Sequence, residues 1–139
     1  FHFQLPGYMN WVPNGTEQDS GGYTQIYVTE MPAQRIELNY GAGITTSLRN
    51  SMQEVLNNHT AMGAGCAINT YHVIQETGNN LTFSTTLDQC SNGKAMFEII
   101  KTYNMPDGQY DILYSTNPQV TPPKMIQQMT RIVESTTVS

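Results

Sequence analysis

The stretch CAINTYHVIQETGNNLTFSTTLDQC, residues 66–90, decides how this chain is read, because it combines two strand-like runs with a turn. The runs 67–77 and 81–87 are rich in β-branched and aromatic residues, and the Gly-Asn-Asn between them tolerates the positive φ of a tight turn. We therefore predict an antiparallel hairpin, in which the numbers of facing residues keep a constant sum. A turn centred on Gly78 sets that sum at 156.

The only two cysteines of the chain fit the same arithmetic. Cys66 and Cys90 also sum to 156, so they should face each other across the hairpin or miss by one residue, within reach of a disulfide. Closing this 25-residue segment would stabilise the fold by about 3–4 kcal/mol in the chain-entropy model. A metal site would need more ligands than two cysteines supply, whereas two free buried thiols remain an alternative. We expect the disulfide, which indicates an oxidising compartment.

Outward from this hairpin, residue spacing predicts a second hairpin and two helices. Apolar residues at helical spacing cover one face over 48–56 (Leu48, Met52, Val55 and Leu56). A second helix begins near the Pro-Pro at 122–123 and carries Ile126, Met129, Ile132 and Val133 on its inner face. Runs 95–103 and 109–115 flank an Asp-Gly turn and predict a hairpin, although 95–103 alone also fits a helix.

The N-terminal third of the chain predicts short strands. Residues 1–5, 23–29 and 35–40 have strand composition, and 8–22 is expected to be a short strand or a loop. The complete order predicts one domain over residues 1–139 of α+β class, with a central, mainly antiparallel β-sheet flanked by helices as an α/β/α sandwich.

Three segments carry a resemblance to a known family: FHFQLPGYMNW (1–11), DGQYDILYST (107–116) and PPKMIQQMTRIVEST (122–136). In these segments and in element order the chain resembles the Mog1p/PsbP-like superfamily, which includes secreted or periplasmic bacterial relatives of the DcrB type. The resemblance implies an antiparallel sheet between helices and a binding or assembly role rather than catalysis. Mog1p-type members bind a small GTPase and PsbP-type members dock on a photosynthetic complex, but neither set of contact residues can be matched here. A hairpin disulfide departs from the family pattern.

Composition narrows the classes of partner. The formal charge is −5, from 11 acidic and 6 basic residues without a basic run, so nucleic acid is not expected as a partner. No stretch approaches the roughly 20 apolar residues that span a bilayer. The chain starts at Phe1 without a basic, apolar leader, and we expect that a signal peptide has been removed. No cofactor is expected, and a monomer is favoured.

A glycine-rich segment, Tyr40–Ser47, is the sharpest candidate for a ligand site. It precedes the first predicted helix, so free N–H groups and hydroxyls can converge on an anion. The candidate anion-binding residues are Gly41, Gly43, Thr45, Thr46, Arg35 and Arg49. Their spacing fits neither the Walker A nor the dinucleotide fingerprint. An ordinary loop with a capped helix start is the alternative, and we weigh it above the anion site.

Other chemistry-bearing residues form weaker patterns. Tyr8, Met9 and Trp11 are candidates for protein contact, although Trp11 alternatively fills the core. His72 and Glu76 should share a strand face, and a surface pair is favoured over a metal site. No residues are assigned to catalysis, because no nucleophile with base and orienting acid is recognisable.

These observations predict a secreted or periplasmic, non-enzymatic domain that binds an unidentified protein partner. An exported bacterial factor acting on a host is one form of this hypothesis. The first alternative is a small-ligand or anion-binding protein that uses residues 40–47. The second alternative is a hydrolase whose pocket and paired acids the sequence does not reveal.

Overall fold

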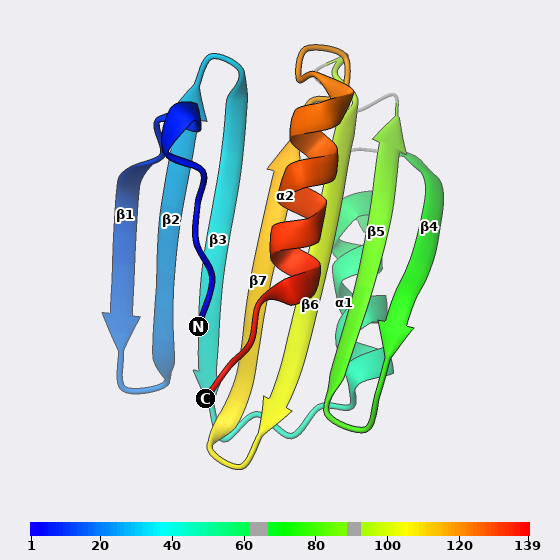
Figure 1. The fold of residues 1–139 in the computed structure, drawn as a ribbon. Helices are drawn as coiled ribbons and strands as arrows, with labels where there is room; N and C mark the ends of the chain where they lie inside the picture. The colour runs from blue at the N-terminus through cyan, green and yellow to red at the C-terminus, as the bar shows by residue number, and fades with distance from the viewer. Residues whose placement is uncertain (62–66, 89–92) are drawn as a thin grey trace.

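Within residues 1–61, 67–88 and 93–139, which a computed structural model of the chain describes, seven antiparallel strands form a single sheet (Figure 1). The side chains of residues 58–61, 67–69 and 88 lie outside that description. The strands are β1 (Val12–Asp19), β2 (Gly22–Glu30), β3 (Ala33–Ala42), β4 (Ala67–Glu76), β5 (Asn80–Asp88), β6 (Met96–Met105) and β7 (Gly108–Thr116). Their order across the sheet is β1-β2-β3-β7-β6-β5-β4. The described helices are α1 (Leu48–Ala61), α2 (Pro123–Ser135) and a 3-10 turn (Gly7–Met9).

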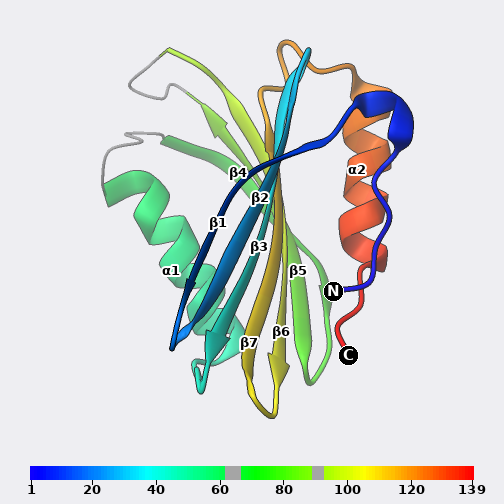
Figure 2. The ribbon, with the colours of Figure 1, turned by 90° about the vertical axis from the view of Figure 1, so that its left-hand side faces the viewer.

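The two α-helices lie on opposite sides of the sheet (Figure 2), and the expected α+β class is confirmed. α2 packs against β6 and β7, whereas α1 packs against β4, β5 and β6. β3 pairs with β7, far away in the sequence, so this pairing joins the three N-terminal strands to the four C-terminal strands. The termini lie close together, because His2 and Thr137 exchange backbone hydrogen bonds.

Side-chain alternation along the strands divides the core into one cluster beneath each helix. The buried cluster on the α2 side contains Met9, Ile36, Leu38, Ile99, Ile112, Tyr114, Met129 and Val133. The buried cluster on the α1 side contains Leu48, Met52, Leu56, Leu81, Phe83 and Ile100. Both helices therefore bury residues of their predicted apolar stripes, and both helix predictions are confirmed.

The cysteine-bounded segment forms the predicted hairpin between β4 and β5. Facing residues sum to 156 from Thr70↔Thr86 to Val73↔Phe83, as expected for a turn at Gly78. Irregularities on either side of this stretch shift the register by one residue. Cys66 and Cys90 lie outside the described residues, so their disulfide stays a prediction.

Residues 95–103, for which the sequence left strand and helix open, belong almost entirely to β6. This strand lies between β5 and β7, and six consecutive residues, 98–103, are buried. A central strand with both faces covered does not need the polar alternation of a half-exposed strand. The sequence of this strand therefore shows no clear period-two alternation of polar and apolar residues, and this explains why a helix fitted the pattern equally well.

The strand predicted for residues 1–5 does not form. The segment makes one isolated β-bridge, His2↔Thr137, while Phe1, Phe3 and Leu5 pack against the α2-side core. The alternating apolar residues of this segment face the core, but the segment does not pair into the sheet as a strand.

Residues 12–19 form edge strand β1, one of the two options expected for 8–22. The register shifts between Pro13 and Thr16, and Gly15 within this bulge has a φ of 135°. A bulge and a proline are tolerated at an edge because the outer N–H groups have no ladder partner.

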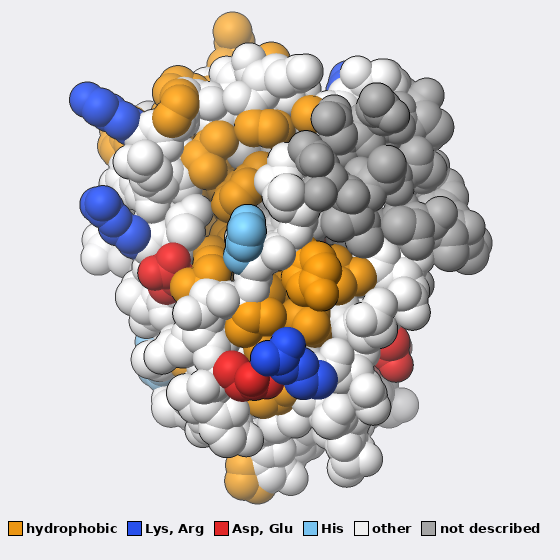
Figure 3. Space-filling view, turned by 90° about the vertical axis from the view of Figure 1, so that its right-hand side faces the viewer, with side chains coloured by type: hydrophobic (Ala, Val, Ile, Leu, Met, Phe, Trp, Pro, Cys, Tyr) orange, Lys and Arg blue, Asp and Glu red, His pale blue; other side chains and the backbone are white. Residues whose placement is uncertain are grey.

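The second edge of the sheet, β4, faces the viewer in Figure 3, where hydrophobic side chains lie between polar ones. Tyr71 and Ile74 on this strand are 50% and 43% exposed. Two irregularities interrupt β4, and such bulges hinder edge-to-edge pairing with another chain.

Candidate functional site

Aligned rows of side chains cross the face of the sheet on which α1 lies. Residues paired across antiparallel strands point to the same face, so the ladder registers define these rows. From β2 through β3 to β7 the rows are Val28-Arg35-Ser115, Ile26-Glu37-Leu113 and Thr24-Asn39-Asp111. Since α1 packs against β4, β5 and β6, the parts of these rows on β2 and β3 are not under the helix.

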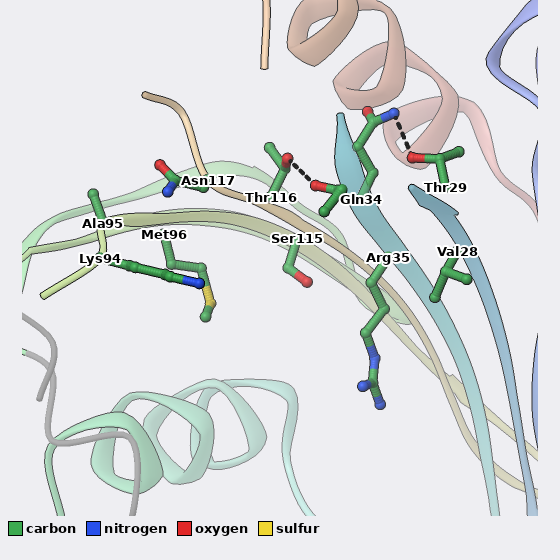
Figure 4. Close-up of a pocket in the computed structure, with 11 residues that line it drawn as sticks. Val28, Thr29, Gln34, Arg35, Lys94, Ala95, Met96, Ser115, Thr116 and Asn117 are labelled. Carbon is green, nitrogen blue, oxygen red and sulfur yellow. Dashed lines mark hydrogen bonds between the residues drawn. The ribbon is translucent and has the colours of Figure 1, made fainter. Parts of the chain in front are cut away.

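A pocket of about 330 Å³ lies at the end of the sheet, around the first row. Its surface is mainly apolar, with apolar side chains from Val28, Ala33, Ala95 and Met96. Its polar lining comes from Thr29, Gln34, Arg35, Lys94, Ser115, Thr116 and Asn117. Arg35, Ser115 and Met96 point to the side of the sheet on which α1 lies (Figure 4). A mainly apolar pocket with a few convergent polar groups is the usual form of a small-ligand site.

A buried polar network holds the sheet end behind this pocket. Tyr114 Oη donates to Gln34 Oε1 at 2.6 Å, and Gln34 Nε2 donates to Thr29 Oγ1 at 3.0 Å. Thr116 Oγ1 donates to the Ala33 carbonyl at 2.9 Å. Burial raises the pKa of Tyr114 further above neutral pH. These bonds connect β2, β3 and β7, and the pocket is therefore pre-formed.

Two basic side chains border the pocket, Arg35 from β3 and Lys94 from the segment before β6 (Figure 4). Arg35 Nη2 lies 3.3 Å from Glu37 Oε2, and these side chains are 46% and 25% exposed. A guanidinium presents a planar fork of donors that matches a carboxylate. The Arg35 side of the pocket therefore suits an anionic group.

Asp111 is a perturbed carboxyl group two rows away from the pocket. Its Oδ1 is closed to solvent and has no hydrogen-bond partner. Burial raises the pKa of Asp111 to about 6; a hydrogen bond from Thr102 acts against this rise, and the charge of Glu37 adds to it. Negative charge thus lies on the same face as the basic end of the pocket.

The glycine-rich loop is not brought together with its predicted basic partners. Arg35 lies at the other end of β3 from Gly41, six residues or about 20 Å along the strand. Arg49 forms a two-bonded ion pair with Glu76 of β4, with N···O distances of 2.7 Å in both bonds. This pairing raises the pKa of Arg49 and lowers that of Glu76.

The loop's own polar groups are largely engaged within the protein. Gly43 N–H donates to a carbonyl of the β6–β7 turn at 3.0 Å, and the Thr46 carbonyl accepts two side-chain amides at 3.3 Å. Ser47 Oγ caps α1 by accepting the Asn50 N–H at 3.2 Å. Thr45 is exposed. The internal hydrogen bonds of the loop and the capped start of α1 therefore account for the structure of this segment without a ligand.

Aromatic rings stand in a row on the opposite face, near the same loop. Ring centroids lie 5.6 Å apart for Tyr23 and Tyr40, and 4.6 Å apart for Tyr40 and Tyr110. Tyr110 Oη donates to Asp107 Oδ2 at 2.6 Å; this bond, with burial and the charge of Asp107, raises the pKa of Tyr110 to about 12. Rings this close leave no room for a ligand between them. We infer that their contacts stabilise the pairing of β2, β3 and β7.

The three protein-contact candidates differ in exposure. Met9 is 6% exposed and belongs to the α2-side core, so it is not a surface contact. Trp11 packs partly against the same core, and its Nε1 is buried without a partner. Tyr8 is 64% exposed, and its hydroxyl donates to Gln128 Oε1 at 2.5 Å. Tyr8 alone has the exposure expected of an anchor for another protein.

The predicted face-sharing of His72 and Glu76 is wrong. The register shifts between Val73 and Gln75, and such a bulge reverses the alternation, so Glu76 turns towards Arg49 of α1. Among the described residues, no group of three or more His, Cys, Asp or Glu side chains is placed to hold a metal ion. None of the helices in those residues is long and apolar enough to cross a membrane.

Of the residues lining the pocket, the sequence had singled out only Arg35. Val28, Met96 and Ser115 belong to separate segments that meet through the β3–β7 pairing and its neighbours. A partial signal did exist, because alternate positions 35, 37 and 39 are all polar and mark one face of β3 as water-facing.

Comparison with protein-family models gives no match, and comparison with curated protein sequences gives none either. The Mog1p/PsbP-like resemblance therefore stays a hypothesis, and the site has to be interpreted from its own chemistry.

Proposed function

We propose that this chain is a non-enzymatic binding domain that holds a small amphipathic molecule, anionic at one end, in the pocket beside Arg35 and Lys94. The observation that carries the proposal is the meeting of an apolar surface with two basic side chains in a pocket of about 330 Å³. This volume falls at the lower end of the range for small-molecule sites.

Each part of such a ligand has a complementary surface. Val28 and Met96 offer apolar contact to a short hydrocarbon chain, which gains free energy when it leaves water. The Arg35 fork can take a carboxylate with two parallel hydrogen bonds. The Ser115 hydroxyl, which points to the same side of the sheet as Arg35 (Figure 4), can fix its orientation.

Calorimetric titration with hexanoate, hexanol and hexylamine tests the proposal. Hexanoate should bind more tightly than hexanol, and hexylamine should bind least. Arg35→Gln combined with Lys94→Gln should weaken hexanoate binding at least tenfold, whereas Lys124→Gln on the exposed start of α2 should leave it unchanged. Hexylamine that binds as tightly as hexanoate, or more tightly, would refute the anion pocket.

We further propose that the domain is an α/β/α sandwich of Mog1p/PsbP-like type and is secreted or periplasmic, with a Cys66–Cys90 disulfide. The helices on opposite sides of the sheet and the central hairpin register support this proposal. Intact mass after alkylation under denaturing conditions tests the bond. Two labels before reduction, in protein never exposed to reductant, would remove the argument for an oxidising compartment.

A second candidate function is contact with a protein partner, which the exposure of Tyr8 favours. Tyr8 and Val12 are 64% and 48% exposed on either side of Trp11. A photocrosslinking residue at position 8 should yield a defined adduct that excess wild-type protein suppresses. The control is the same residue at Met31, which is 95% exposed; equal adducts from both positions would reject this surface.

A further inference from the structure

The basic end of the pocket is followed directly by an acidic side chain on the same strand. Arg35 and Glu37 occupy neighbouring rows on one face of β3, about 7 Å apart along the strand. Arg35 also lines the pocket, whereas Glu37 lies just beyond it beside Leu113. A ligand that enters the pocket with its anionic end therefore has a carboxylate within reach of its other end.

The ion pair between these two residues is loose enough to open. Its N···O distance is 3.3 Å, longer than the roughly 2.7–2.9 Å of strong charge-assisted hydrogen bonds. The two side chains remain 46% and 25% exposed, and exposed pairs of this kind contribute little to stability. Replacing this contact with contacts to a ligand is therefore not costly.

The charge of Glu37 determines which class of ligand gains the most binding free energy when it displaces the Arg35–Glu37 ion pair. A simple anion that takes Arg35 leaves the Glu37 carboxylate without its cation and close to the ligand's own negative charge. A zwitterion supplies each side chain with an opposite charge and exchanges one loose ion pair for two. The unpartnered Asp111 Oδ1 in the next row adds to the preference for a positive group on this side.

We infer that the pocket is selective for a zwitterion that carries a carboxylate and an ammonium at the two ends of a short apolar chain. Its carboxylate binds Arg35, its ammonium binds Glu37, and its chain lies against Val28 and Leu113. Free ω-amino acids and short peptides share this chemistry. The inference rests on the proposed function, because it requires the same pocket to bind the anionic end.

Matched probes separate the charge requirements. Hexanoate, 6-aminohexanoate and hexylamine have the same chain length and differ in their end groups, and the dipeptide alanylleucine represents the peptide source. In calorimetric titrations 6-aminohexanoate or alanylleucine should bind at least fivefold more tightly than hexanoate. Whichever of these two zwitterions binds more tightly identifies the source, and either result supports the inference.

Variants at Glu37 test whether this residue causes the preference. Glu37→Gln should abolish the preference for 6-aminohexanoate and leave hexanoate bound as tightly as before, or more tightly. Glu54→Gln on the exposed side of α1 is the matched control and should keep the preference. Glu37→Asp, which keeps the charge but shortens its reach, should give an intermediate preference and serves if Glu37→Gln does not fold.

The outcomes distinguish the two proposals. If hexanoate binds at least as tightly as both zwitterions, or if Glu37→Gln keeps the preference, the zwitterion inference is wrong and the anion pocket stands. If hexanoate and both zwitterions all fail to bind, the proposed function itself fails and the inference falls with it.

Discussion

The two halves of the sheet face that carries α1 share the same ladder rows but differ in what covers them. The row containing Glu37 and Leu113 continues across β6 and β5 as Ile100 and Phe83, which are 3% and 1% exposed beneath α1. Over β2 and β3 the same row is partly exposed. The position of the helix therefore decides where the face is a core and where it can meet a ligand.

Truncation beneath the helix should have the largest effect on stability. Phe83→Ala removes a fully buried ring from the α1-side cluster and should lower the free energy of unfolding by about 3–5 kcal/mol. Leu113→Ala, in the same row but only partly buried, should cost less than half as much. Urea unfolding measures both variants, and equal losses would show that the two halves do not differ as described.

The buried carboxyl group of Asp111 on β7, where the two halves meet, should give the next largest effect, with the opposite sign. The folded-state pKa of Asp111 is raised from 3.8 to about 6, so its ionisation disfavours the folded state. The protonated Asp111 carboxyl group makes its full contribution to the stability of the fold below about pH 4, and this contribution is lost as the pH rises through about 6. Asp111→Asn should therefore stabilise the protein at pH 7.5 by roughly 1–3 kcal/mol and have little effect at pH 3.5.

Unfolding curves of wild type and Asp111→Asn at these two pH values measure the difference. Thr102→Val is a second test. Removing the hydrogen-bond donor that lowers the pKa of Asp111 should move the midpoint of the pH-dependent loss of stability to higher pH. A stabilisation that is equal at both pH values would contradict the assignment to ionisation.

The ion pair at the boundary should matter least. Arg49 joins α1 to Glu76 of β4, but both side chains are largely exposed, at 55% and 40%. Arg49→Gln should lower the melting temperature slightly at low salt and by less near 1 M salt, where the screening length falls to about 3 Å. A large loss that persists in high salt would place this pair among the contacts that hold the helix on the sheet.

Much of the local structure could be predicted because neighbouring residues alone encode it. The turn at Gly78 set the register of the central hairpin, and apolar spacing located both helices. Residues 1–5 were misassigned, because alternation shows that a segment has an apolar face but not what that face packs against. The His72–Glu76 relation failed for a related reason, since a bulge of one residue reverses the alternation on which it depended.

The site could not be predicted to the same degree. Arg35 was chosen for its charge but assigned to the glycine-rich loop because of its nearness in sequence. The direction of β3 separates Arg35 from that loop and pairs it with Ser115, eighty residues further along the chain. Strand partners at such separations are selected by the packing of the whole sheet, and no local pattern encodes them.

The sequence by itself determined the α+β class, the two amphipathic helices and the register of the cysteine-bounded hairpin, since turn chemistry and hydrophobic periodicity act over a few residues. Only the tertiary structure decided that β3 pairs with β7, that α1 covers β4, β5 and β6, and that the pocket forms beside Arg35. The physical reason is that burial and charge at a given side chain depend on which distant segments pack around it.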